Sequence, residues 1–173
     1  MSAMGGSSAP ADLGLLQPSF TFPAEGQYKV FVDFWLSDGD RVQVSAPFTI
    51  GSASVPAVKL EPDQSLTQSL DDVMQVTLKS DKPLIARQDL VLSFEFKDSA
   101  GTVRTNDIQV ISRNLLKLEM IDESLSAYLQ PELVNRQQIG FAVNFPKAGI
   151  YKLWLTFLYP GIEQKMAFVV SVK

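Results

Sequence analysis

Apolar and polar residues alternate along most of the chain after about the first twenty positions. This period of two is expected of half-buried β-strands, whose successive side chains point to opposite faces of a sheet. The breaks between the segments are rich in aspartate, glycine and proline, which are turn residues. The alternating segments are 28–34, 73–78, 90–96, 139–145 and 151–157. We therefore predict an all-β fold built from short antiparallel strands.

One segment departs from this alternation. Residues 122–130 begin with two acidic residues, place Leu125 and Leu129 four positions apart, and are followed by Pro131. Acidic residues at the start and a proline after the end are helix boundary signals. We therefore predict at most two turns of helix in this segment.

The chain contains an internal repeat. Residues 20–34 recur as residues 143–157, and each copy is followed by a turn and a further strand segment. Self-similarity of this kind takes precedence in assigning a fold. Both copies carry the motif Phe-Pro-x-x-Gly-x-Tyr, whose corner residues are Pro23, Gly26 and Tyr28 in the first copy and Pro146, Gly149 and Tyr151 in the second.

The residues of this motif suit a corner between two strands. Proline lacks an N–H donor and ends the preceding strand, and glycine tolerates the backbone angles of a tight corner. We expect Tyr28 and Tyr151 to begin the next strand, with the ring inward and the hydroxyl bonded to the backbone of the corner. This arrangement resembles the tyrosine corner of immunoglobulin-like sandwiches.

The repeat sets the expected domain organisation. About ninety residues with five or six strand candidates precede the second corner, whereas only nineteen residues precede Phe20. We predict immunoglobulin-like antiparallel β-sandwich units in tandem, the first of them incomplete, with its missing strands supplied by an upstream segment or another chain. The expected parts are a flexible lead-in (1–11), the last three strands of a sandwich (12–50), a linker (51–56) and a complete sandwich (57–173).

At its two Phe-Pro-x-x-Gly-x-Tyr stretches the chain resembles the bacterial exported immunoglobulin-like β-sandwich proteins related to the YtkA-like family. The resemblance implies an extracytoplasmic location (periplasmic, cell-surface or secreted), often with a lipid anchor, and no established reaction. Related sequences typically carry a His-rich tract before their last three strands. Gln130-Pro131 stands where a His-Pro pair would be expected, so the resemblance carries no metal ligand over to this chain.

Composition narrows the classes of function. The chain of 173 residues has no histidine and no cysteine, which removes the usual nucleophile–base pairs and the commonest zinc and copper ligands. Fifteen basic residues against nineteen acidic ones make a nucleic-acid partner a poor match. No apolar run is long enough for a membrane span. We expect a protein that is not an enzyme and needs no cofactor.

The candidate binding residues are aromatic. Phe31, Trp35 and Trp154 alternate with the inward positions of their strands, so they are expected on the outer faces, where they could anchor a protein or stack on a glycan. We therefore predict a non-catalytic binding or structural module that recognises its partner through a sheet face or edge. The alternatives are a carbohydrate-binding sandwich and a copper-handling envelope protein with Met1 and Met4 as thioether ligands.

Overall fold

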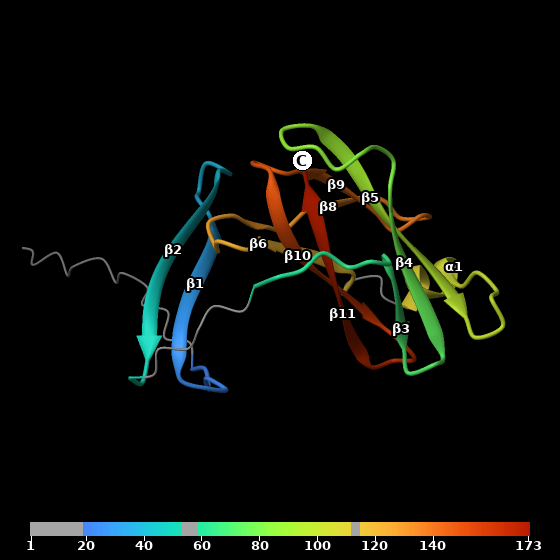
Figure 1. The fold of residues 1–173 in the computed structure, drawn as a ribbon. Helices are drawn as coiled ribbons and strands as arrows, with labels where there is room; N and C mark the ends of the chain where they lie inside the picture. The colour runs from blue at the N-terminus through green and yellow to red at the C-terminus, as the bar shows by residue number, and fades with distance from the viewer. Residues whose placement is uncertain (1–18, 53–58, 112–114) are drawn as a thin grey trace, which may run out of the picture. The chain divides into compact units, whose positions relative to one another are not determined.

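The computed structural model describes residues 19–52, 59–111 and 115–173. They form an N-terminal hairpin within residues 19–52 and a C-terminal domain within residues 59–173. Eleven strands and one short helix are present among these residues, so the predicted all-β class is confirmed (Figure 1).

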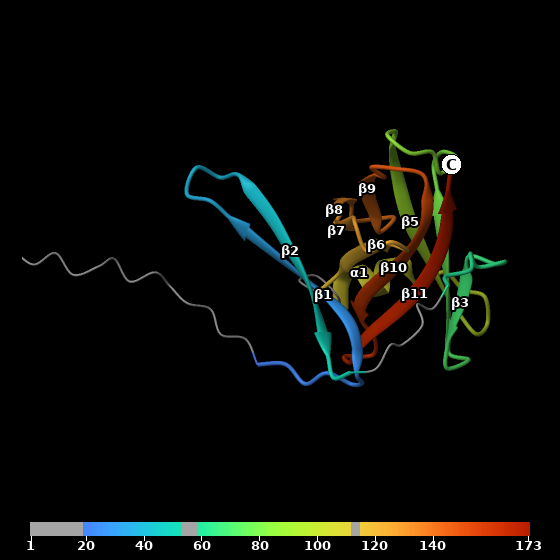
Figure 2. The ribbon, with the colours of Figure 1, turned by 60° about the vertical axis from the view of Figure 1, so that its left-hand side comes forward.

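The N-terminal hairpin consists of two ten-residue strands, β1 (Gly26–Trp35) and β2 (Arg41–Ile50). They form a two-stranded sheet, seen as a long ribbon in Figure 2. A loop closes the hairpin: the Leu36 amide donates to the Asp40 carbonyl over 2.8 Å, and the Asp40 amide donates to the Asp38 carboxylate over 3.1 Å. Asp38 and Gly39 thus act as the turn residues that the sequence suggests.

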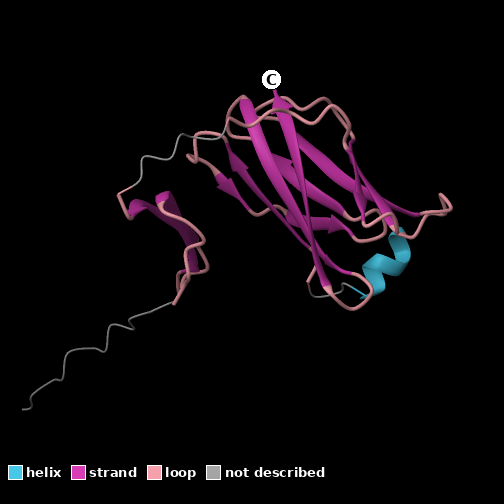
Figure 3. Ribbon diagram, turned by 60° about the horizontal axis from the view of Figure 1, so that its bottom comes forward, coloured by secondary structure: helices cyan, strands magenta, loops and turns pink. Residues whose placement is uncertain are grey.

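The C-terminal domain contains two antiparallel sheets, and Figure 3 shows its strands together with the single helix. One sheet has the order β3-β4-β5-β9-β8 and the other β11-β10-β6-β7. The strands are β3 (Thr67–Leu70), β4 (Met74–Ser80), β5 (Asp89–Asp98), β6 (Lys117–Asp122), β7 (Tyr128–Leu129), β8 (Glu132–Asn135), β9 (Gly140–Asn144), β10 (Gly149–Leu158) and β11 (Glu163–Val172).

The core of the domain is formed by the inward side chains of both sheets. Phe94 of β5 contacts Phe168 of β11 with ring centroids 5.7 Å apart, and Phe96 contacts Phe157 of β10 at 5.0 Å. The alternation in the sequence is therefore the alternation of buried and outward positions. The most deeply buried large side chains are Tyr151, Phe94, Phe96, Phe141, Phe145, Phe157, Phe168, Met74, Leu92, Ile108, Leu118 and Met120.

The helix predicted at residues 122–130 is absent. Asp122 ends β6, its carboxylate accepts hydrogen bonds from the backbone amides of Ser126 and Ala127, and Leu125 has a positive φ of 53°. Tyr128 and Leu129 then pair with β6 as strand β7. An aspartate that accepts several local amides favours a turn over a helix, and this explains the wrong prediction.

The helix of the domain lies elsewhere, as α1 (Thr105–Ile111). Ile108 of this helix is buried in the core, and the Thr105 hydroxyl accepts a hydrogen bond from the Phe96 amide over 3.1 Å. The short segment Thr-Asn-Asp at its start is a helix N-terminal signal that the sequence analysis did not use.

The third strand predicted for the N-terminal unit stays a prediction, because most of its segment lies outside the described residues. Residues 19–25 contain no strand, and residues 12–18 lie outside the described part of the chain. In the domain the corresponding strand, β9, pairs with β5 on one side and β8 on the other. A strand requires such a neighbour for its backbone hydrogen bonds, and the hairpin sheet offers none to residues 19–22.

None of the helices in the described ranges is long and apolar enough to cross a membrane. The predicted lead-in, residues 1–11, and most of the predicted linker, residues 51–56, lie outside the described ranges.

Candidate functional site

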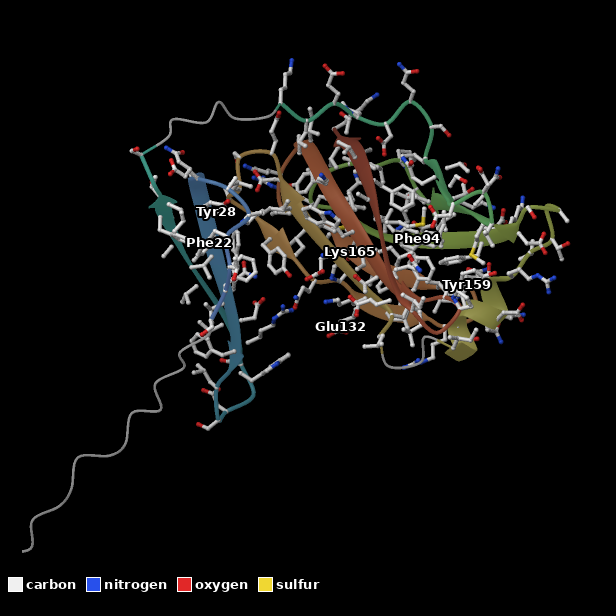
Figure 4. The ribbon with its side chains drawn as sticks, turned by 90° about the horizontal axis from the view of Figure 1, so that it is seen from below. Phe22, Tyr28, Phe94, Glu132, Tyr159 and Lys165 are labelled. Carbon is white, nitrogen blue, oxygen red and sulfur yellow. The ribbon has the colours of Figure 1, made fainter. Side chains whose placement is uncertain are left out.

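The two corners have nearly the same geometry. The Tyr28 hydroxyl donates to the Ala24 carbonyl over 2.6 Å, and the Tyr151 hydroxyl donates to the Lys147 carbonyl over 2.9 Å. In each case the acceptor lies four residues before the tyrosine. The rings of Phe22 and Tyr28, labelled in Figure 4, have centroids 4.9 Å apart, as do those of Phe145 and Tyr151. The repeat in the sequence is thus a repeat in structure at the level of side chains.

The glycine of each corner is required by the backbone. Gly26 has a φ of 151° and Gly149 a φ of 145°, values that residues with a side chain rarely adopt. A Cβ built on Gly149 would meet no atom within 4 Å, so space is not the constraint there. Pro23 precedes β1, and Pro146 lies between β9 and β10, so neither proline is part of a strand.

A charged network reinforces the second corner. Asp122 is buried, and its carboxylate forms an ion pair with Lys147 at 2.9 Å. The Lys147 ammonium also donates to the hydroxyls of Ser124 and Ser126, over 2.9 and 2.7 Å. In the first copy, Ala24 occupies the position of Lys147. The second corner is therefore held by a charged network that the first copy cannot form.

This network controls the ionisation of Asp122. Burial alone would raise the pKa of its carboxyl group. The hydrogen bonds from Ser124, Lys147 and the backbone amides of Ala127 and Ser126 outweigh burial and hold the pKa far below the ordinary aspartate value. Lys147 is thus paired with a carboxylate that remains ionised, so it is poorly placed to act as a general base toward Ser124 or Ser126.

The inner face of the N-terminal hairpin is apolar and exposed. Val30, Val32 and Phe34 of β1 are 44%, 41% and 40% exposed, whereas the equivalent Leu153, Leu155 and Phe157 of β10 are fully buried at 0%. On β2 the same face carries Val44, which is also exposed. We call this surface the hairpin face; its members are Tyr28, Val30, Val32, Phe34, Val42, Val44, Ala46, Phe48 and Ile50.

The pairing of β2 with β1 is displaced by one residue compared with the pairing of β11 with β10. The loop closes between Leu36 and Asp40, whereas in the domain the Tyr159 amide donates to the Ile162 carbonyl, also over 2.8 Å. The extra loop residue places Phe48 opposite Tyr28, where their rings stack with centroids 5.9 Å apart. It also places Ala46 where the domain has Phe168, so the hairpin face is less bulky at its centre.

The outer face of the hairpin is polar around one exposed tryptophan. Trp35 is 69% exposed, and the Arg41 guanidinium lies 5.9 Å from the centre of its indole ring. Asp33 forms an ion pair with Arg41 at 3.3 Å and accepts a hydrogen bond from Gln43 over 3.0 Å. Phe31, the third aromatic candidate from the sequence, lies on the same strand and is half-buried.

Trp154 lies on the outer face of β10, where lysines cover it on two sides. The ammonium groups of Lys152 and Lys165 lie 5.4 and 5.5 Å from the centre of its ring. Trp154 pairs across the sheet with Glu119, and Glu119 forms an ion pair with Lys165 at 3.3 Å. The indole is therefore engaged within the domain, in contrast to the indole of Trp35.

Glu119 and Tyr128 form a hydrogen-bonded pair on this outer face. The Tyr128 hydroxyl donates to Glu119 over 2.8 Å and accepts from the Gln130 amide over 2.8 Å. Burial and the bond to Glu119 raise the pKa of Tyr128 to about 12. Burial also acts to raise the pKa of Glu119, but the hydrogen bond from Tyr128 and the nearby lysines bring it below its ordinary value.

The structure offers little to a metal ion. In the described part of the chain no group of three or more acidic side chains comes together as a candidate cation site. Met1 and Met4, the sulfur ligands considered from the sequence, lie outside the described residues. Asp71 and Asp72 form the turn between β3 and β4 with positive φ values of 45° and 55°, a structural role that suits aspartate.

A shallow hollow on the domain lies beside Lys79, Ser93 and Glu95. The carboxylate of Glu95 is already paired there, with Lys79 at 2.6 Å and Lys97 at 2.9 Å. The hydrogen bonds from these two lysines lower its pKa, so Glu95 is ionised and unsuited to donate a proton near neutral pH.

Sequence reasoning placed the three aromatic candidates on outer faces, and the incomplete first unit that it predicted implied an apolar sheet face in need of a cover. The signal was present in the repeat, because each apolar position of 28–34 has a counterpart in 151–157. What the sequence lacked was the burial of each copy, which depends on facing strands that, in the described part of the chain, accompany the second copy alone.

The comparisons with known proteins bear on the domain alone. A family model described as a domain of unknown function, DUF8832, matches residues 68–173. No curated protein and no solved structure matched the chain. The matched range begins in β3 and ends with β11, so it includes both sheets and the second corner. Because this range is more than half of the chain, the protein belongs to the DUF8832 family.

Proposed function

We propose that this protein is a non-catalytic binding or structural module that recognises a protein partner through a sheet face or edge. The observation that carries the proposal is the hairpin face, in which Val30, Val32, Phe34 and Val44 are 40–49% exposed. Contiguous exposed apolar surface of this kind marks interaction sites in soluble proteins. Trp35, on the other face of the same hairpin, adds an exposed aromatic anchor of the type enriched at binding hot spots.

Composition and side-chain pairing support a role without catalysis. The chain has no histidine and no cysteine to serve as base or nucleophile. The buried Asp122 and the half-buried Glu119 are engaged in ion pairs within the domain. Carboxylates held in this way with lowered pKa values stabilise a structure rather than transfer protons.

The strand order supports an immunoglobulin-like assignment as part of this proposal. Constant-type immunoglobulin domains have sheets ordered A-B-E-D and C-F-G. If β4, β5, β9 and β8 are taken as A, B, E and D, the second sheet reads G-F-C as β11, β10 and β6. The tyrosine corner then falls at the start of strand F, as it does in those domains.

We further propose an extracytoplasmic location in a bacterium, by resemblance to the exported YtkA-like sandwich proteins. The resemblance lies in the two Phe-Pro-x-x-Gly-x-Tyr corners, and these have matching geometry here. Binding modules on small sandwich domains are common at cell surfaces, which fits a role in contacting another envelope protein.

The experiment is a quantitative capture from a bacterial cell-envelope extract with the immobilised full chain. Val32→Asp places a charge on the hairpin face, and Ser45→Asp places the same charge on the other face of the same hairpin. We expect Val32→Asp and Trp35→Ala each to reduce retention of an identified protein at least about tenfold, with Ser45→Asp retaining it. A hot-spot loss of 1.4 kcal/mol corresponds to that factor.

Trp154→Ala extends the test to the domain. Because two lysines already cover the Trp154 indole, we expect it to change retention less than Trp35→Ala does. If the Val32 and Trp35 variants keep every partner of the native chain, the proposed recognition surface is wrong.

A further inference from the structure

We propose that the hairpin face is the closing layer of a second β-sandwich, and that its occupant is an antiparallel strand set equivalent to β4, β5, β6 and β8 of a DUF8832-type domain. This inference rests on the proposed function and specifies the chemistry of the partner. The partner is an incomplete sandwich, open where its last strands would lie.

The first argument is the matched design of the two hairpins. They share the corner hydrogen bond, the Phe–Tyr ring contact and the alternation of apolar residues. In the domain this design is used to close a sandwich: the inner side chains of β10 and β11 are buried against the other sheet, as the contact of Phe168 with Phe94 shows. Because residues 22–50 have the same design, we expect their apolar face also to pack against a second sheet.

The second argument is the chemistry of the hairpin face itself. Its nine members carry no charge, and the valines and aromatic rings are of the kind that fill sandwich cores. A two-stranded ribbon is only marginally stable in water without a packed face. A nucleic acid, a metal ion or a polar glycan would not bury these apolar side chains, whereas a second apolar sheet would bury them.

The family match also bears on the occupant. It covers residues 68–173 and includes β10 and β11, so the closing hairpin is part of the family domain. The described residues contain one apolar sheet of the type needed as cover, β3-β4-β5-β9-β8, and β10 and β11 already occupy it. The occupant of the hairpin face is therefore a further strand set of this kind.

The hairpin also specifies how the occupant differs from the domain. Ala46 takes the position of Phe168, whose ring contacts Phe94 on the opposite sheet at 5.7 Å. A close-packed core does not leave a void as large as the difference between a phenylalanine and an alanine side chain. The occupant therefore carries a bulkier residue opposite Ala46 than a plain copy of β5 would supply.

An extended form of the full chain tests the inference. A second copy of residues 59–144 is joined directly to Phe22, replacing residues 1–21, so the junction Asn-Phe-Pro of the domain is preserved. Hydrogen exchange read by mass spectrometry then measures protection of the β1 and β2 amides in the extended and the original chains. Because the added strands contain Phe94, an Ala46→Phe version is made in parallel to restore the matching pair.

We expect amides in β1 and β2 to exchange at least about a hundredfold more slowly in the Ala46→Phe extended chain than in the original chain. Val32→Asp should abolish this protection, and Ser45→Asp should preserve it. Ala46→Phe alone, without the added strands, should leave exchange in the original chain unchanged.

Three outcomes overturn the inference. The first is an absence of slowing in both extended chains. The second is a hairpin that, in the monomeric original chain, already exchanges as slowly as β10 and β11. The third is a concentration-dependent dimer of the original chain that Val32→Asp dissociates, because the occupant is then a second copy. The exchange experiment contains no component of the cell envelope, so a negative result there leaves the proposed function standing. Conversely, a negative result in the capture experiment does not alter the exchange rates.

Discussion

The hairpin of β1 and β2 and the hairpin of β10 and β11 share a sequence pattern and a corner but differ in burial. Val32 is 41% exposed and the equivalent Leu155 is 0% exposed, although both follow a tyrosine bonded to the fourth residue before it. The corner and the alternation thus specify a twisted two-stranded ribbon, and a facing sheet is what converts that ribbon into a core. The pairing of the two strands is therefore encoded locally, whereas the burial of their apolar face depends on a second sheet.

The largest difference in stability is expected when Val32 and its equivalent Leu155 are each replaced by alanine. Leu155→Ala should lower the free energy of unfolding of the domain by about 3 kcal/mol, since it opens a cavity in the core. Val32→Ala should change it by less than about 0.5 kcal/mol, as expected for a position without core contacts. Urea denaturation followed by Trp154 fluorescence, in a Trp35→Phe background, measures both. Equal losses would show that the hairpin face is part of the same core.

The charged network at the second corner should contribute the next largest effect. Asp122→Ala should cost about 2 kcal/mol, because Lys147, two serine hydroxyls and three backbone amides lose their acceptor. Ala24 cannot form such a network, so Ala24→Lys should leave the stability of the domain unchanged. Urea denaturation at pH 7 measures the unfolding free energy of both variants. A loss below about 0.5 kcal/mol in Asp122→Ala would contradict a structural role for the network.

The same network makes a prediction about pH. The pKa of Asp122 is lower in the folded state than in the unfolded chain, so its contribution is complete above the unfolded value, near 4. The contribution is lost as the pH falls toward the lower folded pKa. The stability difference between the native chain and Asp122→Asn should therefore be constant from pH 7 to 5 and shrink below pH 4. A difference that grows on acidification would reverse the sign of the proposed shift.

The corner hydrogen bonds give a smaller contrast. Tyr151→Phe removes one side-chain bond to the backbone and should cost about 1 kcal/mol in the domain. Tyr28→Phe removes the equivalent bond in the hairpin and should leave unfolding of the domain unchanged, while hydrogen exchange of β1 accelerates. If Tyr28→Phe destabilised the domain as much as Tyr151→Phe, the two corners would belong to one cooperative unit.

Much of this architecture was predictable because it is locally encoded. Leu90 to Phe96 alternates at the period of a strand and is buried at every second position in β5. The corners were predictable for the same reason, since proline, glycine and tyrosine act within seven residues of one another. The candidate site was predictable only in part: Trp35 is exposed as expected, whereas Trp154 is covered by Lys152, two residues before it on β10, and by Lys165 on the next strand.

The failures of prediction share a physical cause, which is dependence on non-local partners. Residues 122–130 carry helix boundary signals, but pairing of Tyr128 and Leu129 with β6 and the hydrogen bonds to Asp122 override them. Residues 19–22 form no strand because the hairpin sheet offers them no neighbour, whereas residues 12–18, where the repeat also predicts a strand, lie outside the described part of the chain. The alternation alone likewise did not show that the hairpin face is exposed.

The smallest effect, of opposite sign, is expected on the outer face of β10. Thr156 is buried, and its hydroxyl has no hydrogen-bond partner among the described residues. The equivalent Asp33 of β1 is paired with Arg41 and Gln43, as suits a solvated face. Thr156→Val keeps the shape of the side chain and removes the unsatisfied hydroxyl, so it should stabilise the domain by about 0.5–1 kcal/mol. Thr156→Ser, which keeps the hydroxyl and loses a methyl group, should destabilise it in the same denaturation assay. Destabilisation by valine would mean that the hydroxyl is satisfied in solution, and that β10 is less completely covered on its outer face than its burial indicates.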